Sequence, residues 1–135
     1  MFMSTHAKGQ FDVKLTPQAA EDGVGHPSIG RLGLFKQFHG DIEGVAHGQM
    51  LGVRTAVEGS AGYVAIDHVE ASVHGRRGTF VLQHSGTMRQ GQMSLVVTVV
   101  PDSGTDELTG LRGRLDIQIV DGKHYYDFAY ELPSA

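Results

Sequence analysis

Cysteine is absent from the 135-residue chain. The fold therefore has neither a disulfide framework nor a thiolate metal site. The chain also lacks a large excess of charge of one sign. Its 11 basic and 15 acidic residues are dispersed along the sequence and give a formal net charge of -4. Without a basic stripe, the sequence is not typical of a nucleic-acid-binding protein.

Long hydrophobic runs are missing as well. The longest, Leu95–Val100, contains Thr98 and is far too short to span a bilayer. The first residues, Met1–His6, lack the basic and apolar regions of a secretory signal. We therefore expect a cytoplasmic protein with no membrane partner, in which residues 1–8 are loosely held and residues 9–135 form one domain.

Helical periodicity is almost absent, whereas glycine is abundant, with 19 residues. Short runs rich in Val, Ile, Thr, Phe and Tyr alternate between two faces and are separated by glycine clusters, which predicts an all-β domain. The eight expected strands are about Gln10–Leu15, Gly30–His39, Ile42–Val53, Gly62–His74, Thr79–Met88, Gln92–Val100, Gly113–Val120 and Lys123–Leu132.

The connections between these strands are short. Asp121-Gly122 is a strong hairpin signal, because both central residues of a two-residue turn adopt positive φ. Gly75–Gly78 predicts a second hairpin, and Thr105–Leu108 fits one helical turn with Thr105 as its cap. Short strands joined by hairpins indicate a sandwich or a barrel, and closure removes exposed edges. We therefore predict an eight-stranded antiparallel, calycin-like β-barrel, just wide enough for one small ligand.

Hairpin turns determine which residues share a face of the barrel. Counting from Asp121-Gly122 places Ile117 opposite Tyr126 and Leu115 opposite Phe128. The face that carries them is apolar and aromatic, so we expect it inside. Its members are Leu115, Ile117, Ile119, Tyr126, Phe128, Tyr130 and Leu132.

The same count from Gly75–Gly78 places Val73 opposite Phe80 and Asp67 opposite Gly86. Asp67 and His84 then become diagonal neighbours across two strands, about 7–8 Å apart at Cα. The expected inward face holds Tyr63, Ala65, Asp67, Val69, Ala71, Val73, Phe80, Leu82, His84 and Met88.

Lys36 shares a strand face with Leu34 and Phe38 and is expected inside too. The turn that follows has two interpretations. A three-residue loop would turn inward Ile42, Gly44, Ala46 and Met50. A two-residue loop would turn inward Glu43, Val45 and His47. The first is preferred, since an unpaired buried charge is costly.

Three ionisable residues, Lys36, Asp67 and His84, are the candidate catalytic residues. An acid beside an imidazole in an apolar cavity suits proton transfer, and a lysine there could bind a carboxylate or act as a nucleophile. The candidate ligand-binding residues are Tyr63, Phe80, Tyr126, Phe128 and Tyr130. The alternative is a buried structural ion pair with a hydrogen-bonded histidine, which needs no ligand.

Eight histidines raise the question of a metal site, but neither HxH nor HExxH spacing occurs. We expect no metal and no cofactor. Several apolar residues are expected on the outer wall, namely Val64, Ile66, Val81, Val97 and Val99. A homo-oligomer, in the first place a dimer, would cover them, unless the segment Thr16–Ile29 packs across that wall instead.

Six stretches of the sequence carry a family resemblance. They are Lys36–Gly44, Ser60–Ile66, Gly78–Met88, Val99–Thr105, Leu108–Leu111 and Asp121–His124. In these the chain resembles the bacterial domain-of-unknown-function family 3224, and the resemblance runs from about Phe11 to Leu132.

That family looks like the allene-oxide-cyclase and dirigent-type barrels, through the turn Ser103-Gly104-Thr105. The resemblance implies an eight-stranded barrel, often oligomeric, with a central cavity, which in allene oxide cyclases guides the cyclisation of a fatty-acid epoxide. No catalytic residue is carried over from them. Two departures from the family pattern are Asp67-His68, where Glu-Arg is usual, and Asp106, where glycine is usual. The first shortens the inward acid.

Two functions fit these observations. The first is a small-molecule-binding barrel with isomerase or cyclase activity on an apolar or carboxylate ligand in its lumen. The second is a non-catalytic oligomeric interaction or structural protein with a filled barrel. The inward ionisable residues favour the first function, and the apolar outward residues favour the second.

Overall fold

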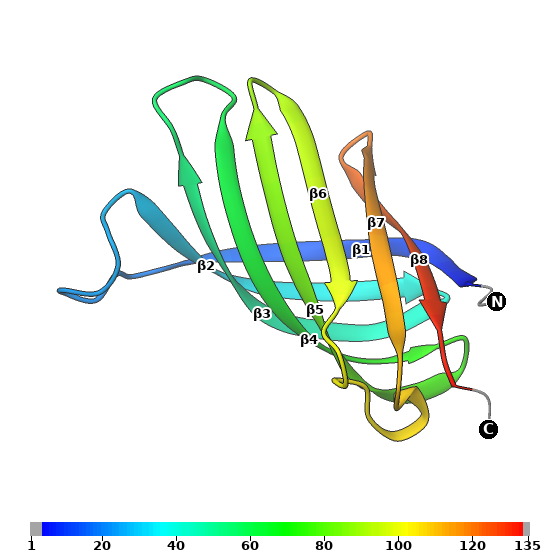
Figure 1. Ribbon diagram of the computed structural model, residues 1–135. Helices are drawn as coiled ribbons and strands as arrows, with labels where there is room; N and C mark the ends of the chain where they lie inside the picture. The colour runs from blue at the N-terminus through cyan, green and yellow to red at the C-terminus, as the bar shows by residue number, and fades with distance from the viewer. Residues whose placement is uncertain (1–3, 134–135) are drawn as a thin grey trace.

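The computed structural model describes residues 4–133 as one closed antiparallel barrel, in which neighbouring strands pair in sequence order and β1 pairs with β8 (Figure 1). The predicted eight-stranded all-β barrel is thus confirmed. Its elements are β1 (Thr5–Gln18), β2 (Ile29–Gly40), β3 (Ile42–Arg54), β4 (Ala61–Val73), β5 (Arg76–Arg89), β6 (Gln92–Val99), the 3-10 turn η1 (Asp106–Leu108), β7 (Arg112–Val120) and β8 (Lys123–Glu131). No helix in the described residues is long and apolar enough to cross a membrane.

β1 is longer than the sequence pattern indicates. It begins at Thr5 instead of Gln10, Thr5 pairs with Tyr130, and Ala7 is fully buried. Residues 5–8, expected to be loosely held, therefore lie in a paired strand. Residues 1–3 of that segment lie outside the described part of the chain.

The β7–β8 hairpin has the predicted register. Asp121 and Gly122 have φ values of 51° and 76°, and Leu115 pairs with Phe128 as counted from this turn. Ile119 was expected inside but is exposed. The reason is that the hairpin tip extends beyond the single residue pair, Thr98–Arg114, that joins β6 to β7.

The β4–β5 hairpin corrects the expected register. Its turn is His74-Gly75, with φ values of 47° and 80°, so Val73 pairs with Arg76 and not with Phe80. A histidine in the left-handed region is uncommon. The glycines at 75 and 78 therefore led to a turn over Gly75–Gly78 being predicted in place of the turn His74-Gly75. The shift is an even number of residues, so the same side chains face inward, and Asp67, now opposite Leu82, is still a diagonal neighbour of His84.

The β2–β3 hairpin confirms the preferred face but not the loop length. Phe38 pairs with Gly44, whereas a three-residue loop would pair it with Ile42. Ile42 and Ala46 are buried as expected. Glu43 and His47 are exposed, so the alternative inward face is wrong.

β6 corrects the expected outer wall. Val97 and Val99 were expected outside, but both are buried, because they pair with the inward-facing His84 and Leu82. The turn Gln90-Gly91, with φ values of 49° and 89°, fixes this pairing.

Ser103 and Thr105 close one end of the barrel against β5. The Ser103 hydroxyl accepts a hydrogen bond from the Val81 amide, and the Thr105 hydroxyl accepts one from the Thr79 amide. The expected helical turn follows as η1, at the lower end in Figure 1, but no side chain caps it. Leu108 from this turn is fully buried, so the motif seals the core.

Candidate functional site

A buried ionic cluster joins three strands inside the barrel. Lys36 on β2 donates to Asp67 Oδ2 on β4 at 2.6 Å, and His84 Nε2 on β5 lies 2.8 Å from the same oxygen. Lys36 Nζ and His84 Nε2 are 3.3 Å apart. All three side chains are less than a tenth exposed. The structure therefore brings together the three residues that the sequence places on the inner face, and their catalytic role stays a prediction.

Two features hold the lysine in place. Its ammonium group is bound by the Asp67 carboxylate and lies 5.6 Å from the centre of the Phe11 ring, a cation–π contact. A buried ion pair of this kind repays its desolvation only when its geometry is good and further hydrogen bonds complete it. Lys36 is therefore committed to Asp67, which makes it a poor candidate for a carboxylate-binding or nucleophilic group.

Asp67 is ionised in the folded protein. Burial by itself would raise its pKa, but the hydrogen bond from His84 and the charge and hydrogen bond of Lys36 outweigh it and hold the pKa below its usual value. Both donors use Oδ2. Oδ1 is the buried side-chain oxygen that no described residue hydrogen-bonds. A Cβ on Gly48 would clash with Oδ1, so glycine at this position provides the space for the carboxylate.

The lowered pKa of Asp67 predicts that the free energy of unfolding decreases at acidic pH. The stability that ionised Asp67 contributes is fully present above about pH 4, near the pKa of Asp in the unfolded chain. It is lost as the pH falls through the lower pKa that Asp67 has in the folded protein. In urea unfolding between neutral and strongly acidic pH, we expect the difference in free energy of unfolding between the natural protein and Asp67→Asn to narrow. Parallel curves for the two proteins would show that Asp67 does not titrate in this way.

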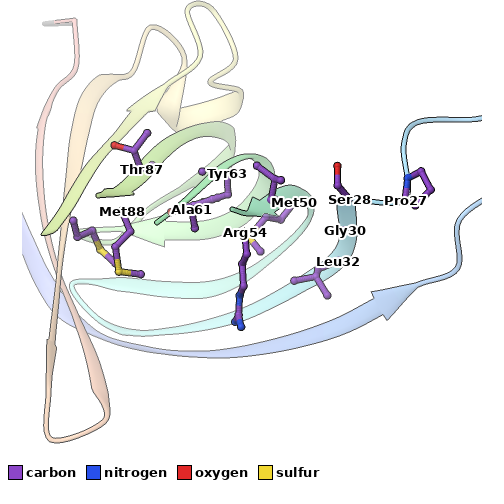
Figure 2. A pocket seen from close by; sticks show the side chains of 15 residues that line it. Pro27, Ser28, Gly30, Leu32, Met50, Arg54, Ala61, Tyr63, Thr87 and Met88 are labelled. Atoms are coloured by element: carbon purple, nitrogen blue, oxygen red, sulfur yellow. The ribbon is translucent and has the colours of Figure 1, made fainter. Parts of the chain in front are cut away.

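A cavity of about 630 Å³ lies at the opposite end of the barrel from the aromatic core. Residues of β2 to β6 and of the loop before β2 line it, and Figure 2 shows Met50, Tyr63 and Met88 among them. Its apolar side chains include three methionines, which adapt to differently shaped ligands. Arg54 is the one charged residue in the lining. This volume is within the range of small-molecule sites.

Tyr63 connects the cavity to the ionic cluster. It lines the cavity, its ring lies over Gly86, and on β4 it is a diagonal neighbour of His84, as Asp67 is on the other side. Burial and the Asp67 charge raise the pKa of Tyr63, so its hydroxyl stays protonated at neutral pH and can donate a hydrogen bond.

The hydrogen bond to Asp67 determines which ring nitrogen of His84 carries the proton and which has the free lone pair. A carboxylate only accepts, so His84 Nε2 carries the proton that it donates to Oδ2. In the neutral ring the lone pair is then on Nδ1. A carboxylate that fixes the tautomer of a histidine in this manner is a common way of presenting a general base.

The other four aromatic residues expected to bind ligand lie in the packed core. Phe80, Phe128 and Tyr130 form a stack, and Tyr126 joins the same cluster of buried residues. None of them lines the cavity. The Tyr126 hydroxyl accepts from the Ile42 amide and donates to the His39 carbonyl, both at 2.8 Å, and burial raises its pKa to about 12. Its position indicates that it fastens the β2–β3 turn.

Four of the other histidines, His6, His26, His39 and His74, pair with acidic or hydroxyl groups near the surface. His74 contacts both Tyr130 and Asp41, and His6 contacts Asp127. Within residues 4–133, no three side chains of His, Asp or Glu come together as metal ligands would.

Sequence reasoning missed most of the cavity lining, including Leu32, Arg54 and Met93. Arg54 and Met50 are an even number of residues apart, so extending the expected strand by one residue, to the observed end of β3, would have placed Arg54 on the inner face. The alternation does not show at which level along the barrel axis the lumen is left unfilled by side chains.

Residues 7–130 match the family described as Protein of unknown function (DUF3224). The chain is also similar to a crystal structure of a protein of unknown function from the DUF3224 family of Shewanella oneidensis MR-1. The two are 48% identical, the match covers 98% of this chain and 99% of that chain, and the TM-score is 0.90. No curated protein matches. Since the family match extends over almost the whole barrel, the chain belongs to the DUF3224 family.

Proposed function

We propose that this protein binds a small, mainly apolar molecule with one anionic group, such as a carboxylate, in the cavity at the open end of the barrel. The observation that carries the proposal is the cavity itself, with Tyr63 in its lining, and with His84 one and Asp67 two inward positions further along the strands. Apolar walls would hold the body of the ligand, and Arg54 would attract the anionic group.

The same residues support a reaction class. His84 Nδ1 is suited to accept a proton and the Tyr63 hydroxyl to donate one, with Asp67 as the positioning residue for His84. A base and an acid beside an apolar space suit an isomerisation or cyclisation, the class that the resemblance to allene oxide cyclases implies. Lys36 neutralises Asp67 in this scheme and does not touch the ligand.

Ligand binding can be tested with 8-anilinonaphthalene-1-sulfonate, a fluorescent molecule with an apolar body and one anionic group. We expect binding to the natural protein and about tenfold weaker binding to Met50→Trp, whose indole would fill the cavity. Gln49→Trp is the matched control, because Gln49 is the residue before Met50 on β3, is exposed and points outward. Equal affinity for the natural protein and Met50→Trp would rule out the cavity as the binding site.

Native mass spectrometry of the purified protein tests the same proposal without a chosen probe. We expect an additional mass from a bound small molecule that Met50→Trp lacks and Gln49→Trp retains. A bound mass present in all three proteins would place the ligand outside the cavity.

A further inference from the structure

The barrel wall is almost unpaired between β6 and β7. A single residue pair, Thr98–Arg114, joins these strands, whereas every residue of β6 is paired with β5 on the other side. Figure 1 shows the two ribbons close together near the lower end and apart above it. In an antiparallel ladder, alternate residues point their amide and carbonyl groups away from the partner strand. The segment Gln92–Val97 therefore has a free hydrogen-bonding edge.

The two strands that face this opening differ in charge. β7 carries Arg112, Arg114 and Asp116, whereas β6, with the sequence QMSLVVTV, carries no charge and no proline. Charged side chains and proline are the usual means by which natural proteins prevent an edge strand from pairing with another chain. β6 lacks both, so its edge is suited to pairing with a further strand.

A row of uncharged and mainly apolar side chains on the outer wall ends at the same edge. Leu51 pairs with Val64, Val64 with Ser85, and Ser85 with Val96, so the row crosses β3 to β6. Val64 is 54% exposed and Val96 44%. The β1–β2 loop does not cover the row, because residues 19–28 are themselves exposed throughout. This row, with neighbouring Ile66, is called the outer apolar row below.

We propose that two copies of this chain pair through the free edge of β6, antiparallel to one another, to form a dimer. A second copy fits because the strand and the outer apolar row are uncharged, so two identical surfaces meet without repulsion. A two-fold axis near Ser94 also brings Val96, where each outer apolar row ends, against β6 of the other copy. Cyclic dimers with such self-complementary interfaces are the commonest oligomers of soluble proteins.

The partner copy would also complete the cavity, a step that rests on the proposed function. Met93 of β6 lines the cavity and is 59% exposed, and no residue of β1, β7 or β8 belongs to the lining. The side that β7 leaves open is therefore the side that a strand paired to β6 would cover. The ligand would then be enclosed by five strands of one copy and the edge of the other.

Light scattering coupled to gel filtration measures the assembly directly. We expect a mass twice that of the 14.5 kDa chain at micromolar concentrations, and a single-chain mass for Val96→Lys with unchanged circular dichroism. Val24→Lys, a matched change of an exposed valine in the β1–β2 loop, should stay dimeric. A natural protein that runs as a single chain, or a Val96→Lys variant that stays dimeric, overturns the interface.

A crosslink provides a second measurement that does not depend on a folded Val96 variant. The chain has no cysteine, so Ser94→Cys introduces a single thiol near the middle of the free edge and close to the expected two-fold axis. We expect mild oxidation to join two copies of Ser94→Cys, whereas Val24→Cys remains mostly unlinked. Equal crosslinking of the two variants contradicts the β6 interface.

Binding of the anilinonaphthalene probe separates this proposal from the proposed function. Weaker binding to monomeric Val96→Lys supports completion of the cavity by the partner. Unchanged affinity leaves the interface in place and overturns that completion. A dimer that does not bind the probe at all overturns the proposed function, while the β6 interface stands.

Discussion

Replacing Asp67 with alanine is expected to lower the free energy of unfolding by about 3–5 kcal/mol, because it leaves the Lys36 ammonium group buried without its counter-ion. Lys36 is 6% exposed, and its hydrogen bond to Asp67 is 2.6 Å long. The loss should appear as a lower urea midpoint with an unchanged slope, since the surface exposed on unfolding stays the same. A loss below about 1 kcal/mol would show that the ion pair is solvated.

The double variant Lys36→Met, Asp67→Leu is the informative control. It removes both charges and fills their space with apolar side chains, an exchange that is often neutral or stabilising for a buried ion pair. We expect it to recover most of the stability that Asp67→Ala loses. Part of the loss should remain, because His84 Nε2 then has no acceptor for its proton and an unpaired buried donor costs about 1–3 kcal/mol.

The double variant also separates the two interpretations of the cluster. If Lys36, Asp67 and His84 are a structural network, the variant should keep any small molecule that co-purifies with the natural protein, and should bind the probe as tightly. If His84 acts on a ligand with Asp67 as its positioning residue, conversion of that ligand should fall while the stability recovers. A loss of activity in a stable protein is a result that a structural role does not produce.

The inward position of this cluster could be predicted although two hairpin registers were wrong. In the β4–β5 hairpin, Val73 pairs with Arg76 and not with Phe80, and in the β2–β3 hairpin, Phe38 pairs with Gly44 and not with Ile42. Both errors are an even number of residues. Side chains alternate with a period of two, so an even shift leaves every residue on the same face.

A shift by an odd number of residues turns every side chain to the other face of the sheet. The expectation for β6 contains an error of this kind. Val97 and Val99 were expected on the outer wall and are buried. The expected strands leave residues 89–91 between β5 and β6 without a defined turn, although Gln90-Gly91 has the composition of a two-residue hairpin turn. Counting from that turn pairs Arg89 with Gln92 and places Val97 opposite His84, on the inner face.

The division of the lumen into a filled and an open part could not be read from alternation. It depends on which side chains meet at the same height, and that requires the correct register. In the observed pairing, Gly30, Gly52 and Gly86 lie in one row across the barrel with Tyr63. Three residues without side chains in a row of four leave space, and the cavity lies there. The shifted register dispersed these glycines along the barrel.

The filled part of the lumen gives the second large expected effect. Phe128→Ala should lower the free energy of unfolding by about 3–5 kcal/mol, as is usual for removing a buried aromatic ring from a packed core. Phe128 is fully buried and stacks on Phe80 and Tyr130, with ring centres 5.9 and 5.3 Å away. Thermal or urea unfolding measures this loss directly.

The same variant tests whether ligand reaches this end of the barrel. If Phe128 serves only the core, the anilinonaphthalene probe should bind Phe128→Ala with its natural affinity, since the cavity is lined by other residues. Met88→Ala, in the cavity lining, is the matched control and should show the reverse, weaker binding with a smaller loss of stability, because Met88 is only partly buried. Weaker binding to Phe128→Ala with little loss of stability would instead mean that the aromatic residues stacked at the filled end of the barrel contact the ligand. The lumen would then be one continuous site, with His84 and Asp67 in its middle and not at its floor.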